Sequence, residues 1–259
     1  MGAGQEGSYV FPIRDLNPTR ITPLVTVALI TVNLLVFFAW QPSVFWSPAG
    51  DQAAAPEFLY RYAAVACEIV SGRPLTVPEI TGQLCLGAQT SVAAPEVSPE
   101  KQPFASVFVS MFLHGGIAHI LGNMWFLWLF GNNVEEAFGH VRYLAVYLVG
   151  GVLATLTFVA AQPENTIPVV GASGAIAAVL GAYFVLFPGK LVLAVAFVNV
   201  IPVPAVIFLG LWFVGQFLIA APGVAWESHA AGFVVGAVVA ATFRGPLLAR
   251  VRRLQGSRA

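Results

Sequence analysis

The chain has 259 residues, of which 58% are hydrophobic and 9% are charged, and its formal net charge at pH 7 is zero. A soluble domain usually carries about 25% charged residues, so too little charge is available to cover a water-facing surface. The composition predicts an all-α polytopic membrane protein, and the neutral charge balance argues against a nucleic-acid partner.

Six apolar segments are long enough to enter a membrane. A hydrocarbon core about 30 Å thick needs roughly 20 apolar residues of helix, and lipid offers no partners for free backbone groups. The six expected helices are 22–40, 106–131, 141–161, 170–187, 203–220 and 227–243. Together they define a six-transmembrane-helix domain over 22–243, whose first helix we expect to be retained rather than cleaved as a signal peptide.

The stretch 188–202 is also apolar, but it is short and is punctuated by Pro188 and Pro202. Proline removes a backbone donor and breaks helices. We therefore expect an interfacial connection here, with a seventh span as the alternative.

Lysine and arginine residues predict that both termini are cytoplasmic. On that topology the short outer loops 162–169 and 221–226 carry no Lys or Arg. The cytoplasmic N-terminal segment 1–21, the inner loops and the basic cytoplasmic tail 244–259 carry the positive charge, at Arg14, Arg20, Arg142, Lys190, Arg244, Arg250, Arg252, Arg253 and Arg258.

The long first extracytoplasmic loop, 41–105, is rich in proline, alanine and acidic residues. Within it, 56–70 has the pattern of a short amphipathic helix. Cys67 and Cys85 both lie in this loop, and an oxidising outer compartment makes a disulfide between them plausible. Two free thiols are the alternative.

Polar residues inside spans are costly and are usually functional. His114, His119 and Asn123 fall at the start of the second span, Ser173 at the start of the fourth and His229 at the start of the sixth. Because these three spans all run from outside to inside, the five groups share one depth near the outer leaflet.

Small residues surround Ser173 and follow His229, and small residues let membrane helices approach closely. They include Gly171, Ala172, Gly174, Ala175, Ala177, Ala178, Gly232 and Gly236. A close approach of the fourth and sixth spans would bring the Ser173 hydroxyl to the His229 imidazole. Neutral imidazole can take the proton of an alcohol, so we interpret Ser173 as an activated nucleophile and His229 as its base.

Acyl transfer also needs donors for the developing oxyanion. The Ser173 amide lies at a helix start, and His119 and Asn123 are four residues apart, so all three groups can donate hydrogen bonds to the oxyanion. For His114 a structural hydrogen bond is as plausible as a catalytic role.

Other interpretations of the same residues stay open. Ser173 could be a packing residue, and Asn123 an interhelical hydrogen-bonding residue. His114, His119 and His229 could supply three nitrogens to zinc, but a spacing of five places the first two off one helix face, and no carboxylate or cysteine is nearby.

These residues resemble the rhomboid family of intramembrane serine proteases, in its bacterial six-helix form, over roughly 105–243. Members show a His-Gly-Gly loop followed by His and Asn four apart, which here are His114, Gly115, Gly116, His119 and Asn123. They show Gly-x-Ser-Gly at the fourth helix, here Gly171, Ser173 and Gly174, and a histidine with small-residue spacing in the sixth, here His229, Gly232 and Gly236.

The resemblance implies a Ser173–His229 dyad and an oxyanion site at the Ser173 amide, His119 and Asn123, with His114, Gly171 and Gly174 as possible support. It implies a serine endopeptidase of a bacterial plasma membrane that cleaves single-span proteins near their outer end. No metal or other cofactor is implied. The expected partners are the lipid bilayer and transmembrane substrates. The resemblance implies that substrates enter sideways beside 203–220 and 221–226; oligomeric state is not predicted.

Two departures from the family pattern matter. Ala177 stands where members often carry an aromatic residue that packs on the catalytic histidine, so Phe233 or Trp226 is expected to hold His229 instead. Ala105 and Ser106 stand where a Trp-Arg pair often anchors the first loop.

The alternative function is a catalytically silent rhomboid-like protein that binds or escorts membrane clients; the presence of both Ser173 and His229 disfavours it. A transporter would need polar groups deep in the spans.

Overall fold

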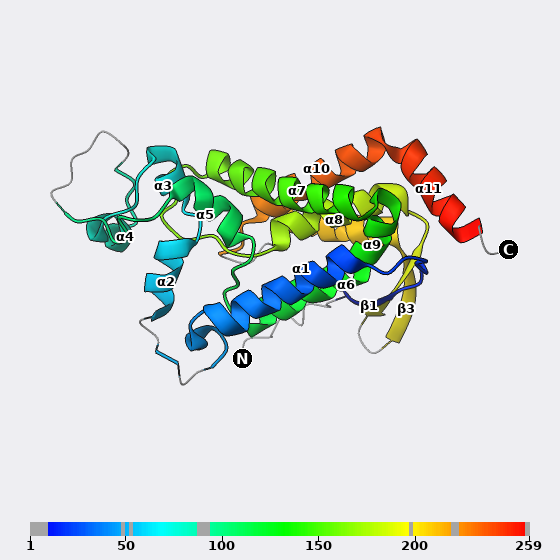
Figure 1. Ribbon diagram of the computed structural model, residues 1–259, viewed down its shortest axis with the longest axis horizontal. Coiled ribbons are helices and arrows are strands. Elements are labelled where there is room, and N and C mark those ends of the chain that lie inside the picture. The colour runs from blue at the N-terminus through cyan, green and yellow to red at the C-terminus, as the bar shows by residue number, and fades with distance from the viewer. Residues whose placement is uncertain are drawn as a thin grey trace, which may run out of the picture.

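The computed structural model describes residues 10–47, 50–51, 54–86, 94–196, 199–218 and 223–256. Helices dominate and form an elongated bundle (Figure 1). Each of the six predicted spans contains a helix: α1 (Leu24–Leu35, continued by a π-helical turn at Val36–Trp40), α6 (Ile117–Phe138), α7 (His140–Ala161), α8 (Ser173–Leu186), α9 (Ala205–Leu218) and α10 (Trp226–Thr242).

The helix lengths and hydropathies identify fewer membrane-spanning helices than the sequence pattern predicts. Within the described ranges α7 is the helix that is long and apolar enough to cross a membrane alone. Helix α10 qualifies together with α11 (Arg244–Gly256), from which it is bent by 76°. The helix Leu24–Trp40, α8 and α9 are apolar but shorter. The number of spans therefore stays a prediction.

Helix α8 is the centre of the bundle, and its side chains from Gly174 to Tyr183 are all buried. A helix that is apolar on every face is expected to be enclosed by neighbours. Here α6, α7, α9 and α10 pack around it. This position fixes Ser173, the first residue of α8, at one end of the core.

Helices α8 and α10 touch backbone to backbone. A Cβ added at Gly236 would lie 1.8 Å from the carbonyl oxygen of Ala178, and one added at Gly232 would lie 2.2 Å from that of Gly174. Only glycine fits such contacts, and dispersion forces favour the close packing they allow. The predicted approach of these two helices is therefore observed.

Two carboxylates at the end of α6 hold the start of α1. Glu135 accepts hydrogen bonds from the backbone N–H of Val25 at 2.9 Å and from the N–H and hydroxyl of Thr26 at 2.8 Å and 2.6 Å. Pro23, just before α1, offers no side-chain acceptor, so the first free N–H groups of the helix depend on this distant residue. His140 Nδ1 lies 2.5 Å from Glu135 Oε1.

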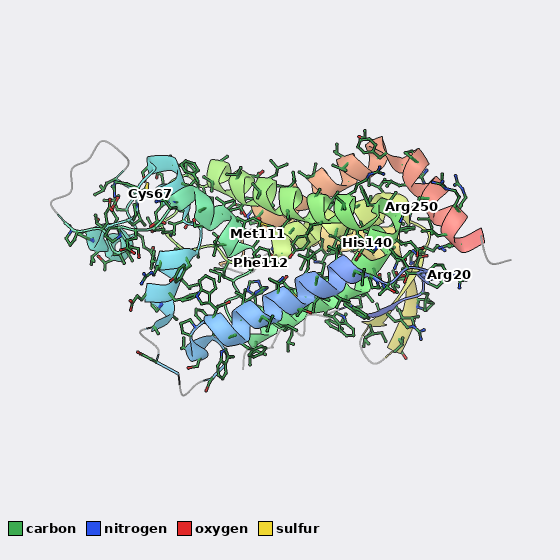
Figure 2. The ribbon with its side chains drawn as sticks, in the orientation of Figure 1. Arg20, Cys67, Met111, Phe112, His140 and Arg250 are labelled. Carbon is green, nitrogen blue, oxygen red and sulfur yellow. A yellow bond between two sulfur atoms is a disulfide. The ribbon has the colours of Figure 1, made fainter. Side chains whose placement is uncertain are left out.

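Glu136 extends the same arrangement to the chain before α1. Its Oε2 accepts from the backbone N–H groups of Arg20 and of Ile21, the latter at 3.2 Å. Figure 2 shows Arg20, His140 and Arg250 at the opposite end of the molecule from Cys67. The α6–α1 junction therefore lies far from the disulfide of the 41–105 loop.

The expectation for 188–202 was incomplete, because this stretch forms a β-hairpin. Strands β2 (Leu191–Ala196) and β3 (Asn199–Pro204) pair antiparallel, and β1 (Val10–Asp15) adds to β2. A seventh span is therefore wrong, and the fold is not purely α. Valine and other β-branched residues favour strands, while Pro202 and Pro204 lie on β3, an outer strand of the sheet, where proline is tolerated.

The predicted second span, 106–131, is divided. Residues Pro103–Ser110 form a separate helix, α5, and α6 begins only at Ile117. The residues between them include Gly115 and Gly116, which interrupt the helical pattern. His114 therefore lies in a loop, whereas His119 and Asn123 occupy the first two turns of α6.

The 41–105 loop contains a short 3₁₀ turn (Ser43–Phe45) and three short helices, α2 (Ala54–Tyr62), α3 (Ala66–Ser71) and α4 (Val77–Gly82). The amphipathic helix expected over 56–70 is thus split into α2 and α3. With α5, these helices gather at one end of the bundle, while the sheet and α11 occupy the other (Figure 1).

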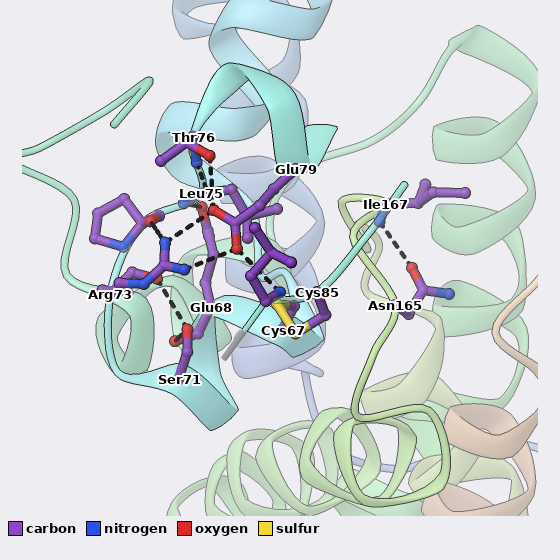
Figure 3. The surroundings of a disulfide bond; sticks show 12 residues. Cys67, Glu68, Ser71, Arg73, Leu75, Thr76, Glu79, Cys85, Asn165 and Ile167 are labelled. Carbon is purple, nitrogen blue, oxygen red and sulfur yellow. Dashed lines mark hydrogen bonds and ion pairs between the residues drawn. A yellow bond between two sulfur atoms is a disulfide. The ribbon is translucent and has the colours of Figure 1, made fainter. Parts of the chain in front are cut away.

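A disulfide joins Cys67 to Cys85, as the sequence suggested (Figure 3). Beside it, Glu79 accepts two hydrogen bonds from the Arg73 guanidinium, at 2.8 Å and 2.9 Å, and forms a capping box with Thr76 at the start of α4. Lys101 forms a buried ion pair with Glu68. Covalent and ionic contacts therefore cross-link the described part of this loop.

The basic tail is helical where the structure describes it. In α11, Leu247 and Val251 are buried, and the Arg250 guanidinium donates to the carbonyl oxygen of Glu136 at 3.1 Å. Arg258 lies outside the described residues. Helix α11 turns sharply from α10, and the two helices meet the length and hydropathy criterion for a span only when they are taken together.

Candidate active site

Ser173 and His229 are in direct contact. The hydroxyl oxygen of Ser173, at the first position of α8, lies 2.7 Å from Nε2 of His229, in the first turn of α10. The backbone contact of Gly232 with Gly174 lies one turn from this pair. Proximity of the two side chains therefore follows from the glycines that let α8 and α10 meet.

A third side chain, Gln216 of α9, completes a chain of hydrogen bonds. Its Oε1 lies 2.7 Å from His229 Nδ1, and its Nε2 donates to the carbonyl oxygen of Trp212 at 3.0 Å. Gln216 is not among the site residues predicted from the sequence. The available signal was that Gln216 is the one amide or ionisable side chain in the predicted span 203–220.

The ring of His229 is held from α9, not by the residues that were expected. Trp212 lies 6.2 Å from the imidazole between ring centroids, tilted by 33°. Phe233 packs on Trp212 and Phe213 instead, and Trp226 packs on Phe217 at 5.2 Å. The aromatic support therefore comes from the neighbouring helix α9, which compensates for Ala177.

His119 points its Nε2 edge at the space beside Ser173. A Cβ added at Gly171 would lie 2.9 Å from His119 Nε2 and 3.5 Å from Ser173 Oγ, so both groups border the same small volume. Gly171 also has a φ of +129°, which a side chain would make unfavourable. The N–H of Gly115 donates to His119 Nδ1 at 3.3 Å, which leaves the proton on Nε2.

Asn123 lies one helical turn after His119 and is buried. Its Nδ2 has no hydrogen-bond partner among the described residues. A buried amide donor normally finds a partner, and exceptions call for an explanation. A donor held ready for an atom that arrives with a substrate is one such explanation.

His114 is tied to the end of the first helix through its backbone. Its N–H donates to Gln41 Oε1, and its carbonyl oxygen accepts from Gln41 Nε2, both at 2.8 Å. The ring is fully buried and lies 5.1 Å from the His119 ring between centroids. These contacts pack the His114 ring against His119 and fix its backbone to Gln41.

The loop that precedes Ser173 is held by α5 and by the 41–105 loop. The N–H of Gly171 donates to the carbonyl oxygen of Ser110 at 2.9 Å, and the Ser110 hydroxyl accepts from the N–H of Ala64 at 2.8 Å. Val169 also pairs with Ala64. Ser110 thus joins α5, the 41–105 loop and the approach to α8.

The three histidines do not assemble into a metal site. Within the described ranges no group of three or more His, Cys, Asp or Glu side chains is placed to hold a metal ion. His229 instead uses both ring nitrogens in contacts with Ser173 and Gln216. The zinc interpretation has no support in this arrangement.

Comparison with known proteins gives one family. The Rhomboid domain matches residues 101–246, more than half of the chain. The chain is 34% identical over 136 residues to the rhomboid protease GluP of Bacillus subtilis. This matched region covers 52% of this chain and 25% of that protein. It is 37% identical over 76 residues to presenilin-associated rhomboid-like protein A, mitochondrial, of Danio rerio, covering 29% of this chain and 20% of that protein.

A third relative is rhomboid-related protein 2 of Mus musculus, 36% identical over 87 residues, or 33% of this chain and 28% of that protein. In each case the matched region spans less than a third of the relative's own length. The matched family region, 101–246, contains each of the site residues described above except Gln41 and Ala64.

Proposed function

We propose that this chain, which belongs to the rhomboid family, is an intramembrane serine endopeptidase with Ser173 as nucleophile and His229 as general base. The rhomboid family is membrane-integral, and one relative carries the name of a protease. The observation that carries the proposal is the 2.7 Å contact between Ser173 Oγ and His229 Nε2. A serine hydroxyl becomes an effective nucleophile when a neutral imidazole accepts its proton at this distance.

The chemistry follows from the order of the groups. Nε2 of His229 takes the hydroxyl proton while Oγ of Ser173 attacks the carbonyl carbon of the scissile peptide. The imidazolium then gives that proton to the leaving amine as the C–N bond breaks, which leaves an acyl ester on Ser173. A water molecule activated by the same imidazole hydrolyses the ester and restores the hydroxyl.

The negative oxygen of each tetrahedral intermediate needs donors. The Ser173 N–H lies at the first position of α8, where it has no partner within the helix. His119 Nε2–H borders the same space, and Asn123 Nδ2–H is buried with no partner in the described part of the chain. We assign these three groups to the oxyanion, where one donor typically contributes about 10²–10³ in kcat.

We propose transmembrane proteins as substrates and a cleavage position near the outer membrane face. The site lies at the starts of α6, α8 and α10, and the distribution of Lys and Arg predicts that these ends face away from the cytoplasm. Such a position also supplies the water that the second half of the reaction consumes. Residues 221 and 222 of the outer loop above the site lie outside the described residues.

The test is cleavage of a single-span model substrate by the purified full-length chain in detergent and in liposomes. Ser173→Ala and His229→Ala are expected to abolish turnover, and a fluorophosphonate probe should label the wild type but not Ser173→Ala. Equal processing by the wild type and both variants would refute the proposal. Substrate binding without any cleavage by the wild type would favour the client-binding alternative.

A further inference from the structure

We propose that Gln216 is a positioning residue that fixes the tautomer and the ring orientation of His229. This inference rests on the proposed function, because it concerns how the base of that reaction is made ready. Gln216 reaches the site from α9, a helix that provides neither the nucleophile nor the base. It makes the one hydrogen bond that the structure gives to the Nδ1 side of the imidazole.

The direction of the Gln216 amide is set by a backbone carbonyl. A carbonyl oxygen can only accept, so the end of the amide that faces Trp212 O at 3.0 Å must be the nitrogen. The carbonyl has two lone pairs, so it can accept this bond in addition to its helical one. Oε1 is therefore the end that faces His229.

This orientation determines where the imidazole carries its proton. Oε1 of Gln216 is an acceptor, so Nδ1 of His229, 2.7 Å away, must be the donor and carry the hydrogen. The opposite nitrogen, Nε2, then has a free lone pair directed at the hydroxyl of Ser173. A base with the other tautomer could not accept the serine proton, and loss of the correct tautomer is costly to serine hydrolases.

A neutral amide suits this position better than a carboxylate. An ionised side chain within a predicted span is costly, whereas an amide orients the ring through a dipole without a net charge. Nearby ionisable groups do not replace Gln216. Glu227, two residues before His229, accepts from Gln162 Nε2 at 2.5 Å, and His119 lies on the Ser173 side of the site.

The position of Gln216 also links the base to α9 as a whole. The buried side chains of α9 are Ala205, Phe208 and Leu209, all in its first half. In the second half, Leu211 and Phe217 are exposed, and the contacts of Trp212 and Gln216 with His229 hold that half against α10. Displacement of this half of α9 would release Nδ1.

The experiment compares three variants of the full-length chain. Gln216→Met keeps the length of the side chain but removes both the acceptor and the donor. Gln216→Glu keeps an oxygen for Nδ1–H, and Leu211→Met is the matched control on the exposed face of the same helix. For each variant we measure kcat and KM on the single-span substrate, the rate of fluorophosphonate labelling of Ser173, and the thermal midpoint in detergent.

We expect Gln216→Met to lower kcat about 10- to 100-fold, a part of what general-base catalysis supplies, and to slow probe labelling similarly while KM changes little. Gln216→Glu should restore most of kcat even though its charge lowers the thermal midpoint, and Leu211→Met should match the wild type in both. A merely structural role would instead make kcat fall together with the thermal midpoint and leave the kcat of Gln216→Glu no better than that of Gln216→Met.

Two results would overturn the inference, and they are distinguishable. Wild-type kcat in Gln216→Met, with Ser173→Ala inactive, would refute the positioning role and leave the protease proposal standing. Full turnover in Ser173→Ala would remove the proposed function, and the role of Gln216 with it. If Gln216→Met is unstable, the kcat of folded Gln216→Glu decides: most of the wild-type kcat supports positioning, and a loss of about 10-fold or more refutes it.

Discussion

Gly232→Ala is the most direct test of how the fold assembles the candidate site. Gly232 lies one turn after His229, and a Cβ there would lie 2.2 Å from the carbonyl oxygen of Gly174, the residue after Ser173. Ordinary van der Waals contact begins near 3.4 Å, so α8 and α10 must separate by about 1.2 Å at this point. Backbone cannot give way as the end of a flexible side chain would.

The displacement can be compared with the contact it disturbs. Ser173 Oγ and His229 Nε2 are 2.7 Å apart, and a separation of that size would lengthen the contact to about 3.9 Å, beyond the range of a hydrogen bond. We therefore expect kcat to fall by about 10²–10⁴, the usual contribution of a general base. Overpacking should also lower the free energy of unfolding by ~1–3 kcal/mol.

The assay is cleavage of the single-span substrate together with probe labelling and a thermal melt. Gly210→Ala on α9 is the matched control, because a Cβ there meets only Phe184 Cε2 at an ordinary 3.8 Å. That control should retain activity. Wild-type turnover and an unchanged thermal midpoint in Gly232→Ala would refute the claim that backbone contact between α8 and α10 sets the site.

Three further predictions concern other parts of the molecule. Asn123→Ala should lower kcat about 10²–10³-fold with little change in KM, and unchanged turnover would remove Asn123 from the oxyanion site. Replacing both Cys67 and Cys85 by serine opens a link across 18 residues and should cost about 3 kcal/mol of unfolding free energy, seen as a lower thermal midpoint; an equal midpoint would contradict this. Burial alone would raise the pKa of Glu79, but hydrogen bonds from Arg73, Thr76 and Leu86 lower it to about 2. The unfolded chain therefore binds more protons between pH 4.5 and 2, so this contribution to stability is complete above pH 4.5 and is lost as the pH falls toward 2; Glu79→Gln should flatten that part of the melting profile, and an identical acid profile would count against it.

The approach of Ser173 to His229 could be anticipated because it depends on local composition. Runs of glycine and alanine at fixed helical spacing indicate close helix contact, and a polar residue at each helix start shares the same depth. The roles of these residues stay predictions. Their geometry, by contrast, needed only helical periodicity and a topology.

The hairpin at 191–204 and its pairing with β1 could not be anticipated in the same way. Val10–Asp15 pairs with residues more than 170 positions later, and no local pattern encodes such a partner. The apolar character of β2 and β3 is equally consistent with a short membrane segment. The break before α6 is easier to predict from the sequence, because Gly115 and Gly116 interrupt the helical pattern there.

Gln216 shows a different limit of prediction from the sequence. Its residue type within an apolar span was visible, but its partner was not, because the direction of a side chain on α9 depends on how that helix packs against α10. Trp212, four residues earlier on the same helix, supplies an aromatic ring beside His229. The aromatic neighbour of His229 therefore depends on the packing of α9 as well.

The dependence of α1 on Glu135 and Glu136 has a consequence for biogenesis. During synthesis α1 leaves the ribosome before α6, and the acceptors for the N–H groups of Val25 and Thr26 are made about 110 residues later. Until the end of α6 arrives, that terminus must rely on water or lipid headgroups. Helix α1 is therefore translated before the groups that complete its start, and its final seating awaits the end of α6.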